Sequence, residues 1–195
     1  MFDIKSAYWA TPLNNRNKKG IPNIGSLTRE RLYKFTCDNK IPYHIIVEEY
    51  GDEFQFIKFY PASKKRDKDR FKIRTNSQKD FSKIVATCIK VCTILLEENP
   101  EKVIGFFGQW DDKDIARKDV ITQRYRIYER LTISKFNKKN YNFITIDESL
   151  NLLLVTSRND RKRSDEKDRD YISKRLTELF PPEKYHEIIN PLIYN

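Results

Sequence analysis

The fold of this chain is decided by residues 77–107, SQKDFSKIVATCIKVCTILLEENPEKVIGFF. Ser77, with Asp80 three residues later, has the pattern of a capping box in which aspartate takes the acidic position. From Phe81 onward apolar residues recur at helical spacing, and further apolar residues widen the arc. Asn99-Pro100 then ends the pattern, because the residue before a proline disfavours the helical conformation. These features predict a largely buried helix at about 78–98.

The apolar run at 102–108 follows this helix directly. Its central residues, VIGFF, contain no charged side chain. A short continuous apolar run is typical of a strand that is buried on both faces of a sheet. We therefore expect a central strand here.

The segments before the helix alternate between apolar and polar residues, as strands do. They are 31–37, 44–50 and 53–60, and the turn Gly51-Asp52 joins the last two. We expect a short fourth strand at 70–74, behind a basic loop. Short connections of this kind predict an antiparallel meander.

Downstream of the central strand the sequence predicts a second helix, rich in Arg and Tyr, at about 114–136. Segments 141–146 and 150–156 then form a predicted hairpin, and a C-terminal helical segment precedes the Pro181-Pro182 break. The predicted fold class is α+β, with an antiparallel sheet packed against the buried helix and the Arg/Tyr-rich helix.

Three regions divide the chain. Residues 1–30 are polar and rich in Pro and Gly, so we expect an N-terminal arm that packs locally or becomes ordered on binding. Residues 31–156 form the predicted α+β core domain. Residues 157–195 form a charged loop and helices, because bases and acids are interleaved there.

Positive charge dominates the composition. The chain has 38 Lys and Arg against 28 Asp and Glu, a formal net charge of +10. Residues 58–74 contain eight bases and two acids, and residues 113–139 contain nine bases and three acids, whereas 48–53 and 97–112 are acidic. A polarised basic surface favours an anionic polymer as partner, and nucleic acid is the commonest. The alternative is a Lys-rich composition without functional meaning.

The usual catalytic and metal-binding patterns are absent from the sequence. The two histidines, His44 and His186, are far apart, and five glycines form no phosphate-binding loop. Cys88 and Cys92 lie on the apolar face of the first helix, where core cysteines are expected. Acids that follow the central strand, from Asp111 on, suit a helix start better than a metal site. We expect no cofactor, no bound metal and no membrane span, and a cytoplasmic location.

Arginine on the second helix leaves two interpretations open. At 100° per residue, Arg117, Arg124 and Tyr128 fall inside the apolar stripe, whereas Arg126 faces the solvated side. A buried guanidinium needs a partner, because an unpaired buried charge is costly. That partner is either an internal carboxylate, for example Asp111, or a phosphate bound in a cleft.

Aromatic residues interleave with the two basic segments, and such residues can stack on unpaired bases. For each aromatic residue singly, a place in the core is the competing interpretation. The candidate nucleic-acid-binding residues are Lys64, Lys65, Arg66, Lys68, Arg70, Arg74, Arg117, Lys118, Arg124, Arg126 and Tyr128.

Residues 50–156 resemble families of small bacterial proteins known only as domains of unknown function. The shared pattern is a strand meander, a helix like 81–96 ending in Asn99-Pro100, a strand like 103–107 and an Arg-rich helix containing Arg124-Tyr125-Arg126-Ile127-Tyr128. The resemblance implies the order of the elements and singles out the Arg/Tyr helix. It implies no activity.

The favoured hypothesis is a non-enzymatic nucleic-acid-binding protein that prefers RNA or single strands to duplex DNA. A nucleic-acid-bound protein complex is a further candidate partner, for instance in phage–host conflict, where an anti-CRISPR inhibitor grips a defence nuclease or its guide RNA. One rival is a metal-independent ribonuclease toxin that uses Arg117, Arg124, Tyr125 and Tyr128. Another rival is a protein-interaction module with an acidic partner.

Overall fold

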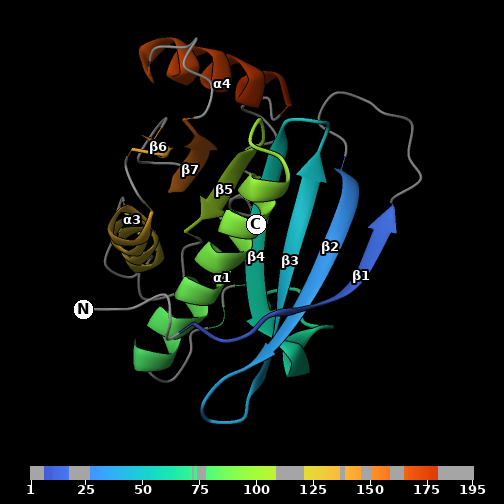
Figure 1. Ribbon diagram of the computed structural model, residues 1–195. Helices are drawn as coiled ribbons and strands as arrows, with labels where there is room; N and C mark the ends of the chain where they lie inside the picture. Colours follow the sequence, from blue (N-terminus) through green and yellow to red (C-terminus); the bar gives the residue numbers. More distant parts are fainter. Residues whose placement is uncertain are drawn as a thin grey trace.

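One seven-stranded sheet organises the computed structural model, which describes residues 7–17, 27–71, 73, 78–108, 121–136, 139–145, 151–158 and 165–179. The strand order is β1-β2-β3-β4-β5-β7-β6 (Figure 1). The strands are β1 (Thr11–Asn17), β2 (Leu27–Thr36), β3 (Pro42–Tyr50), β4 (Phe54–Pro61), β5 (Val103–Phe107), β6 (Tyr141–Thr145) and β7 (Leu152–Ser157). The helices are η2 (Ala62–Lys64), α1 (Gln78–Glu98), α3 (Gln123–Lys135) and α4 (Asp165–Leu179).

The predicted α+β class is confirmed, with one correction to the sheet. Strands β1 to β4 form an antiparallel meander, and β5, β7 and β6 also pair antiparallel. Strands β4 and β5, however, are parallel. The prediction of an antiparallel sheet was wrong at this pair, because α1 carries the chain back along the sheet before β5 begins.

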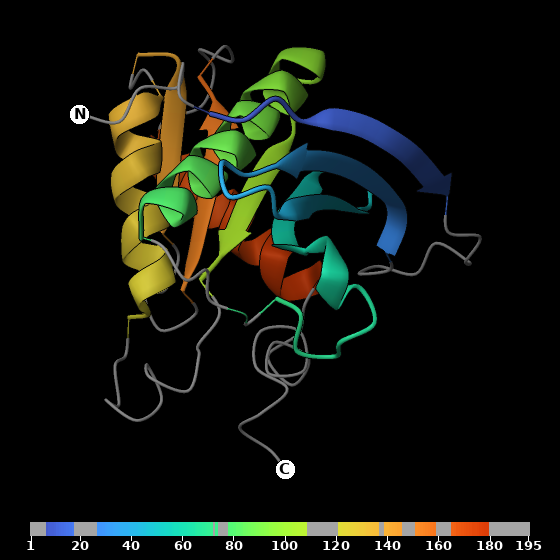
Figure 2. The ribbon, with the colours of Figure 1, turned by 90° about the horizontal axis from the view of Figure 1, so that it is seen from below.

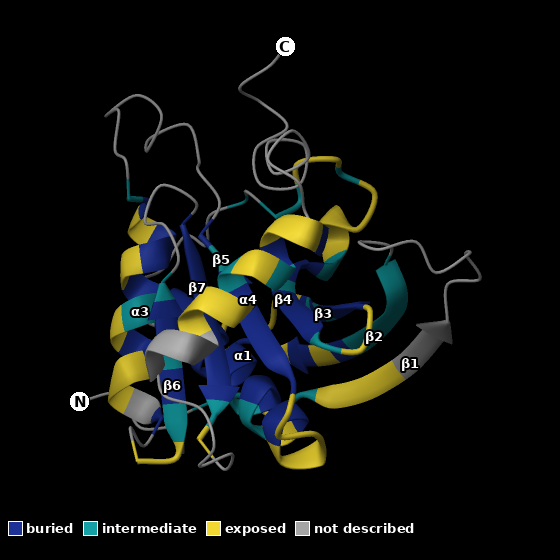
Figure 3. Cartoon of the chain, turned by 90° about the horizontal axis from the view of Figure 1, so that it is seen from above, coloured by how far each residue is buried: buried dark blue, intermediate teal, exposed yellow. Residues whose placement is uncertain are grey.

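Helices cover both faces of the sheet (Figures 1 and 2). On one face, Ile45, Ile57 and Ile104 belong to a core that also contains the buried residues of α1 and α3. On the other face, Phe54 and Phe56 pack with the apolar residues of α4. Figure 3 shows the buried residues at the centre and the exposed residues on the outer sides of α3 and α4. Because successive side chains of each strand point to opposite faces, the sheet contributes to two cores, one on each face.

The buried helix was predicted correctly. Helix α1 spans Gln78–Glu98, and its Ile84, Val85 and Ile89 are fully inaccessible. Cys88 and Cys92 are buried free thiols, and burial raises the pKa of both. They are core residues, as expected. None of the helices in the described part of the chain has the length and hydropathy of a membrane span.

Other elements differ from the predictions. Strand β1 lies within the region expected to be an arm, and it pairs antiparallel with β2. Arg70 and Phe71 lie in a turn rather than a strand, since the Arg70 amide closes back onto the Asp67 carbonyl at 3.3 Å. Residues 141–145 and 152–157 form the predicted hairpin strands, and the helix expected after Pro182 falls outside the described residues.

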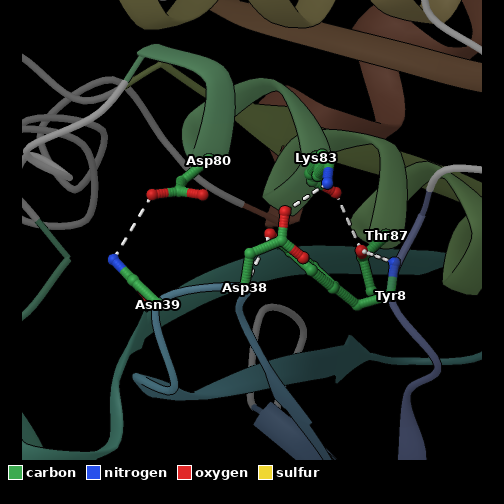
Figure 4. Close-up of polar contacts among 6 residues, drawn as sticks. All are labelled: Tyr8, Asp38, Asn39, Asp80, Lys83 and Thr87. Atoms are coloured by element: carbon green, nitrogen blue, oxygen red, sulfur yellow. Dashed lines mark hydrogen bonds and ion pairs between the residues drawn. The ribbon is translucent and has the colours of Figure 1, made fainter.

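The N-terminal segment is fastened to α1 and to the β2–β3 turn (Figure 4). The Tyr8 amide donates to Thr87 Oγ1 at 3.0 Å, and the Asp38 amide donates to the Tyr8 hydroxyl at 3.2 Å. The Tyr8 ring stacks on Phe35, with 5.5 Å between ring centroids. Burial of the ring is the main cause that raises the Tyr8 pKa to about 12. Tyr8 thus packs against α1, β2 and the turn that follows β2, which lie far from it in the sequence, and not within its own segment.

Substitution of Tyr8 separates the two kinds of contact. We expect Tyr8→Phe to lower the free energy of unfolding by about 0.5–1.5 kcal/mol, because it removes one hydrogen bond. Tyr8→Ala should cost more, about 2–3 kcal/mol, because it also removes the stacked ring. Trp9→Ala is the control, since Trp9 is 77% exposed. Urea denaturation measures all three, and equal losses for the Phe and Ala variants would contradict this assignment.

Gly105 allows β4 and β5 to pack side by side under α4. A Cβ at this position would lie 2.5 Å from two ring carbons of Phe56 and 3.1 Å from a methyl of Leu154. Phe56 has little room to move, because its ring contacts those of Tyr50, Phe54 and Phe107. The position therefore requires glycine.

Gly105→Ala should destabilise the fold by about 1–3 kcal/mol through overpacking. Adding Phe56→Leu to the same chain should recover part of that loss, because it removes the ring that the new methyl meets. A double-mutant cycle by urea denaturation gives the coupling free energy. A coupling of zero would show that the two residues do not compete for the same space.

Candidate nucleic-acid interface

Strand register builds a row of three polar side chains across the sheet. Lys34 of β2 is paired with His44 of β3, and His44 is paired with Tyr60 of β4. Their neighbours in sequence, such as Phe35 and Phe59, belong to the core beneath α1. Because side chains alternate along a strand, the row lies on the face away from α1. The His44 Nδ1 and the Tyr60 hydroxyl are 3.3 Å apart.

The turn after β4 begins at the end of the strand where Tyr60 lies. It presents most of its cations to solvent. Asp67 organises it: its carboxylate accepts from the Asp69 amide at 2.9 Å, and its own amide donates to the Lys64 carbonyl at 3.0 Å. One carboxylate thus shapes the backbone of a short basic segment. Four of its bases are exposed, namely Lys64, Lys65, Arg66 and Lys68.

Arg70 folds back from the turn onto two aromatic rings. Its guanidinium carbon lies 4.6 Å from the ring centroid of Phe71 and 5.4 Å from that of Tyr60. The Arg70 Nε is buried and has no hydrogen-bond partner among the described residues. Stacking of this kind holds a cation in place without neutralising it. We call the whole set the basic corner: Lys34, His44, Tyr60, Lys64, Lys65, Arg66, Lys68, Arg70 and Phe71.

The electrostatics of the basic corner favour an anion. Lys64 forms an exposed ion pair with Asp67, 3.7 Å between Nζ and Oδ2, and exposed pairs of this kind are weak. Desolvation lowers the pKa of His44, and the charges of Lys65 and Lys34 lower it further. Burial first, and the neighbouring cations second, therefore disfavour the positively charged form of the imidazole. A phosphate group would relieve that repulsion.

Lys58 lies beside the basic corner and is paired with a carboxylate. Its ammonium group lies 2.7 Å from Glu48 Oε2 and 5.5 Å from the ring centroid of Phe71. The Tyr50 hydroxyl also donates to Glu48, at 3.0 Å. A small pocket lined by Lys58, Phe71, Phe107, Arg124 and Tyr128 adjoins this pair. Lys58 thus joins the sheet to the turn and is not part of the basic corner.

Arg124 and Tyr128 are buried, with 5% of each residue exposed. The Arg124 guanidinium donates to the Phe71 carbonyl and, at 2.8 Å, to the Ile73 carbonyl. Tyr128 packs among the rings of Phe59 and Phe106, and burial raises its pKa. Arg124 therefore ties the end of the basic turn to α3. We leave both residues out of the interface.

The second helix begins later than the sequence suggested. Thr122 is its N-cap: its hydroxyl accepts from the Tyr125 amide at 3.1 Å and donates to the Gly108 carbonyl at 2.9 Å. Ile121 and Thr122 are not helical, so the predicted start near 114 was wrong for these two residues. Tyr125 is also buried, and its hydroxyl lies 2.8 Å from Thr145 Oγ1.

The predicted site residues thus separate into groups. The structure brings together Lys64, Lys65, Arg66, Lys68 and Arg70. Arg126 is exposed on α3, about 200° around the helix from Arg124. Three predicted site residues lie outside the described residues, namely Arg74, Arg117 and Lys118, and so does Asp111, the suggested carboxylate partner of a buried arginine. The sequence did not identify Lys34 and His44 as site residues, and it indicated Tyr60 only as one of the aromatic residues that could stack on bases, since only strand register reveals that the three are neighbours.

The described part of the chain contains no group of three or more His, Cys, Asp or Glu side chains placed to hold a metal ion. The chain matches no protein-family model, no curated protein and no solved structure. The resemblance to domains of unknown function therefore stays an expectation.

A substitution at Arg124 tests its structural role. Arg124→Met should lower the free energy of unfolding by about 1–3 kcal/mol, because two carbonyl groups lose their donor. Arg126→Met, two residues away on the solvent side, should change it by less than about 0.5 kcal/mol. Urea denaturation gives both values. Similar losses in the two variants would contradict the proposed anchoring of the turn.

Proposed function

We propose that the chain is a non-enzymatic protein that binds RNA or single-stranded nucleic acid through the basic corner. The observation that carries this proposal is the arrangement around Arg70, a cation held against Tyr60 and Phe71 and followed along the turn by exposed bases. Lys and Arg contact phosphates, and aromatic rings and guanidinium planes stack on unpaired bases. Both kinds of group lie together here.

The shape of the basic corner favours a single strand over a duplex. Its cations lie on a short turn and at the end of a three-residue row, not on a helix that could enter a groove. A flexible strand can bring successive phosphates to closely spaced cations, whereas a duplex presents them at fixed positions. Half-buried Phe71 and Arg70 offer stacking surfaces at the same place.

The ribonuclease alternative loses support from its own candidate residues. Arg124, Tyr125 and Tyr128 are all buried, and a phosphodiester would have to reach them through the packed interior. The proposal includes a cytoplasmic location, which agrees with three cysteines that form no disulfide.

Two charge-matched double variants test the proposal. Lys65→Gln with Arg66→Gln removes two cations from the basic corner, and Arg169→Gln with Lys174→Gln removes two exposed cations from α4. Binding of a labelled 12-nucleotide uridine RNA is measured by fluorescence anisotropy from 50 to 300 mM salt. The log–log salt slope should become shallower by about 1.4 in the first variant, because each phosphate contact on a single strand contributes about 0.7.

The second variant should keep the wild-type slope. Equal changes in both variants would show that net charge, and not the basic corner, drives binding. RNA recovered intact after incubation in EDTA at high protein concentration is expected, whereas cleavage would revive the ribonuclease alternative.

A further inference from the structure

His44 lies at a meeting point of three elements of the basic corner. Lys34 faces it from β2 and Tyr60 faces it from β4, each directly opposite in the strand register. Lys65, from the turn after η2, is the third charged or titratable neighbour. The two charged groups that act on the imidazole are both cations. The sheet and the turn thus place two positive charges, those of Lys34 and Lys65, near one titratable ring.

A bound anion would change the protonation of this ring. In the free protein partial burial of the ring, and then two neighbouring cations, disfavour a third positive charge. An oxyanion between Lys34 and Lys65 would offset that repulsion and accept a hydrogen bond from the protonated imidazole. The positive charge on His44 would then cost less free energy than in the free protein. Anion binding and protonation therefore assist each other.

Tyr60 allows the His44 ring to keep one orientation in its neutral and its protonated state. Its hydroxyl lies 3.3 Å from His44 Nδ1, and the two rings meet edge to face with 5.4 Å between centroids. A phenol can either donate or accept a hydrogen bond, so it can pair with the bare nitrogen and with the protonated one. The other ring nitrogen, Nε2, then remains the donor for the anion. Protonation would need no rearrangement of the sheet.

We propose that Lys34, His44 and Lys65 form a phosphate-binding site that takes up one proton when a backbone phosphate of a single strand binds. This inference rests on the proposed function and identifies its chemistry at one place. The ligand is a phosphodiester of RNA or single-stranded DNA, because the site adjoins the stacking surfaces of Arg70 and Phe71.

The sign of the pH dependence follows from linkage. The pKa of His44 is lowered in the free protein and rises when the phosphate binds, so the complex holds more protons than the separate partners. Affinity must therefore increase as the pH falls through the interval between the two pKa values. One proton gives a change of up to about tenfold in the binding constant per pH unit.

The experiment measures affinity for the same uridine RNA between pH 5.5 and 8 at constant ionic strength. Uridine and its phosphodiesters do not titrate in this range, so the slope reports the protein. Wild type should bind more tightly as the pH falls. His44→Gln should bind with no slope at the weak end of the wild-type range, and His44→Lys should bind with no slope at the tight end. His186→Gln, the matched control at the other histidine, should retain the slope.

Proton NMR of the His44 ring gives a second test that needs no variant at His44. Its pKa should lie below 6.5 in the free protein, rise on addition of the RNA, and rise in the free protein when Lys65→Gln removes a neighbouring cation. RNA binding with no pH dependence, or a slope that survives in His44→Gln, would overturn the proton-coupled site and leave the proposed function intact. Absence of RNA binding at every pH would overturn both.

Discussion

Burial of α1 against one face of the sheet is the constraint on which the rest of the structure depends. Apolar residues cover most of the helix surface, so the helix must be buried. Its core residues between Ile84 and Leu96 are nearly inaccessible to solvent. Packing it across the sheet requires the chain to return in the same direction, which makes β4 and β5 a parallel pair. That face is then completed by α3, and Arg31, a charged residue on the same face of β2, is held in ion pairs with Glu49 and Glu98.

Helix α4 covers part of the second face of the sheet. Its Ile172, Leu176 and Leu179 pack with Phe54 and Phe56, near the beginning of β4. Glu53 anchors the helix there, since it accepts from Arg175 at 2.9 Å and from the Tyr171 hydroxyl at 2.6 Å. The basic turn leaves β4 at its other end, about 23 Å away for eight residues of extended chain. The apolar contacts with α4 and the basic turn therefore lie at opposite ends of β4.

The sequence predicted the parts of this arrangement that depend on local pattern. The limits of α1, the central strand and the β6–β7 hairpin follow from periodicity, and the exposed bases of the turn follow from composition. Strand β1 escaped notice because TPLNNRN lies at the edge of the sheet and needs no apolar alternation. The parallel pair and the neighbours of His44 depend on strand order and register, which a single sequence does not specify. Helical spacing correctly placed Arg124 inside, but it could not show that the guanidinium donates to carbonyl groups of a segment more than fifty residues away.

Two basic segments of equal charge therefore have different roles. The turn after β4 projects its cations outward, whereas α3 turns Arg124 inward and uses it to hold that turn. We propose that nucleic acid binds at the basic corner and not on the outer face of α3. Chemical-shift mapping of the ¹⁵N-labelled protein with the uridine RNA tests it most directly. We expect the largest amide shifts at Lys34, His44, Tyr60 and the turn from Lys64 to Phe71. Shifts centred on the outer face of α3, around Arg126 and Arg130, or spread evenly over the surface, would contradict it.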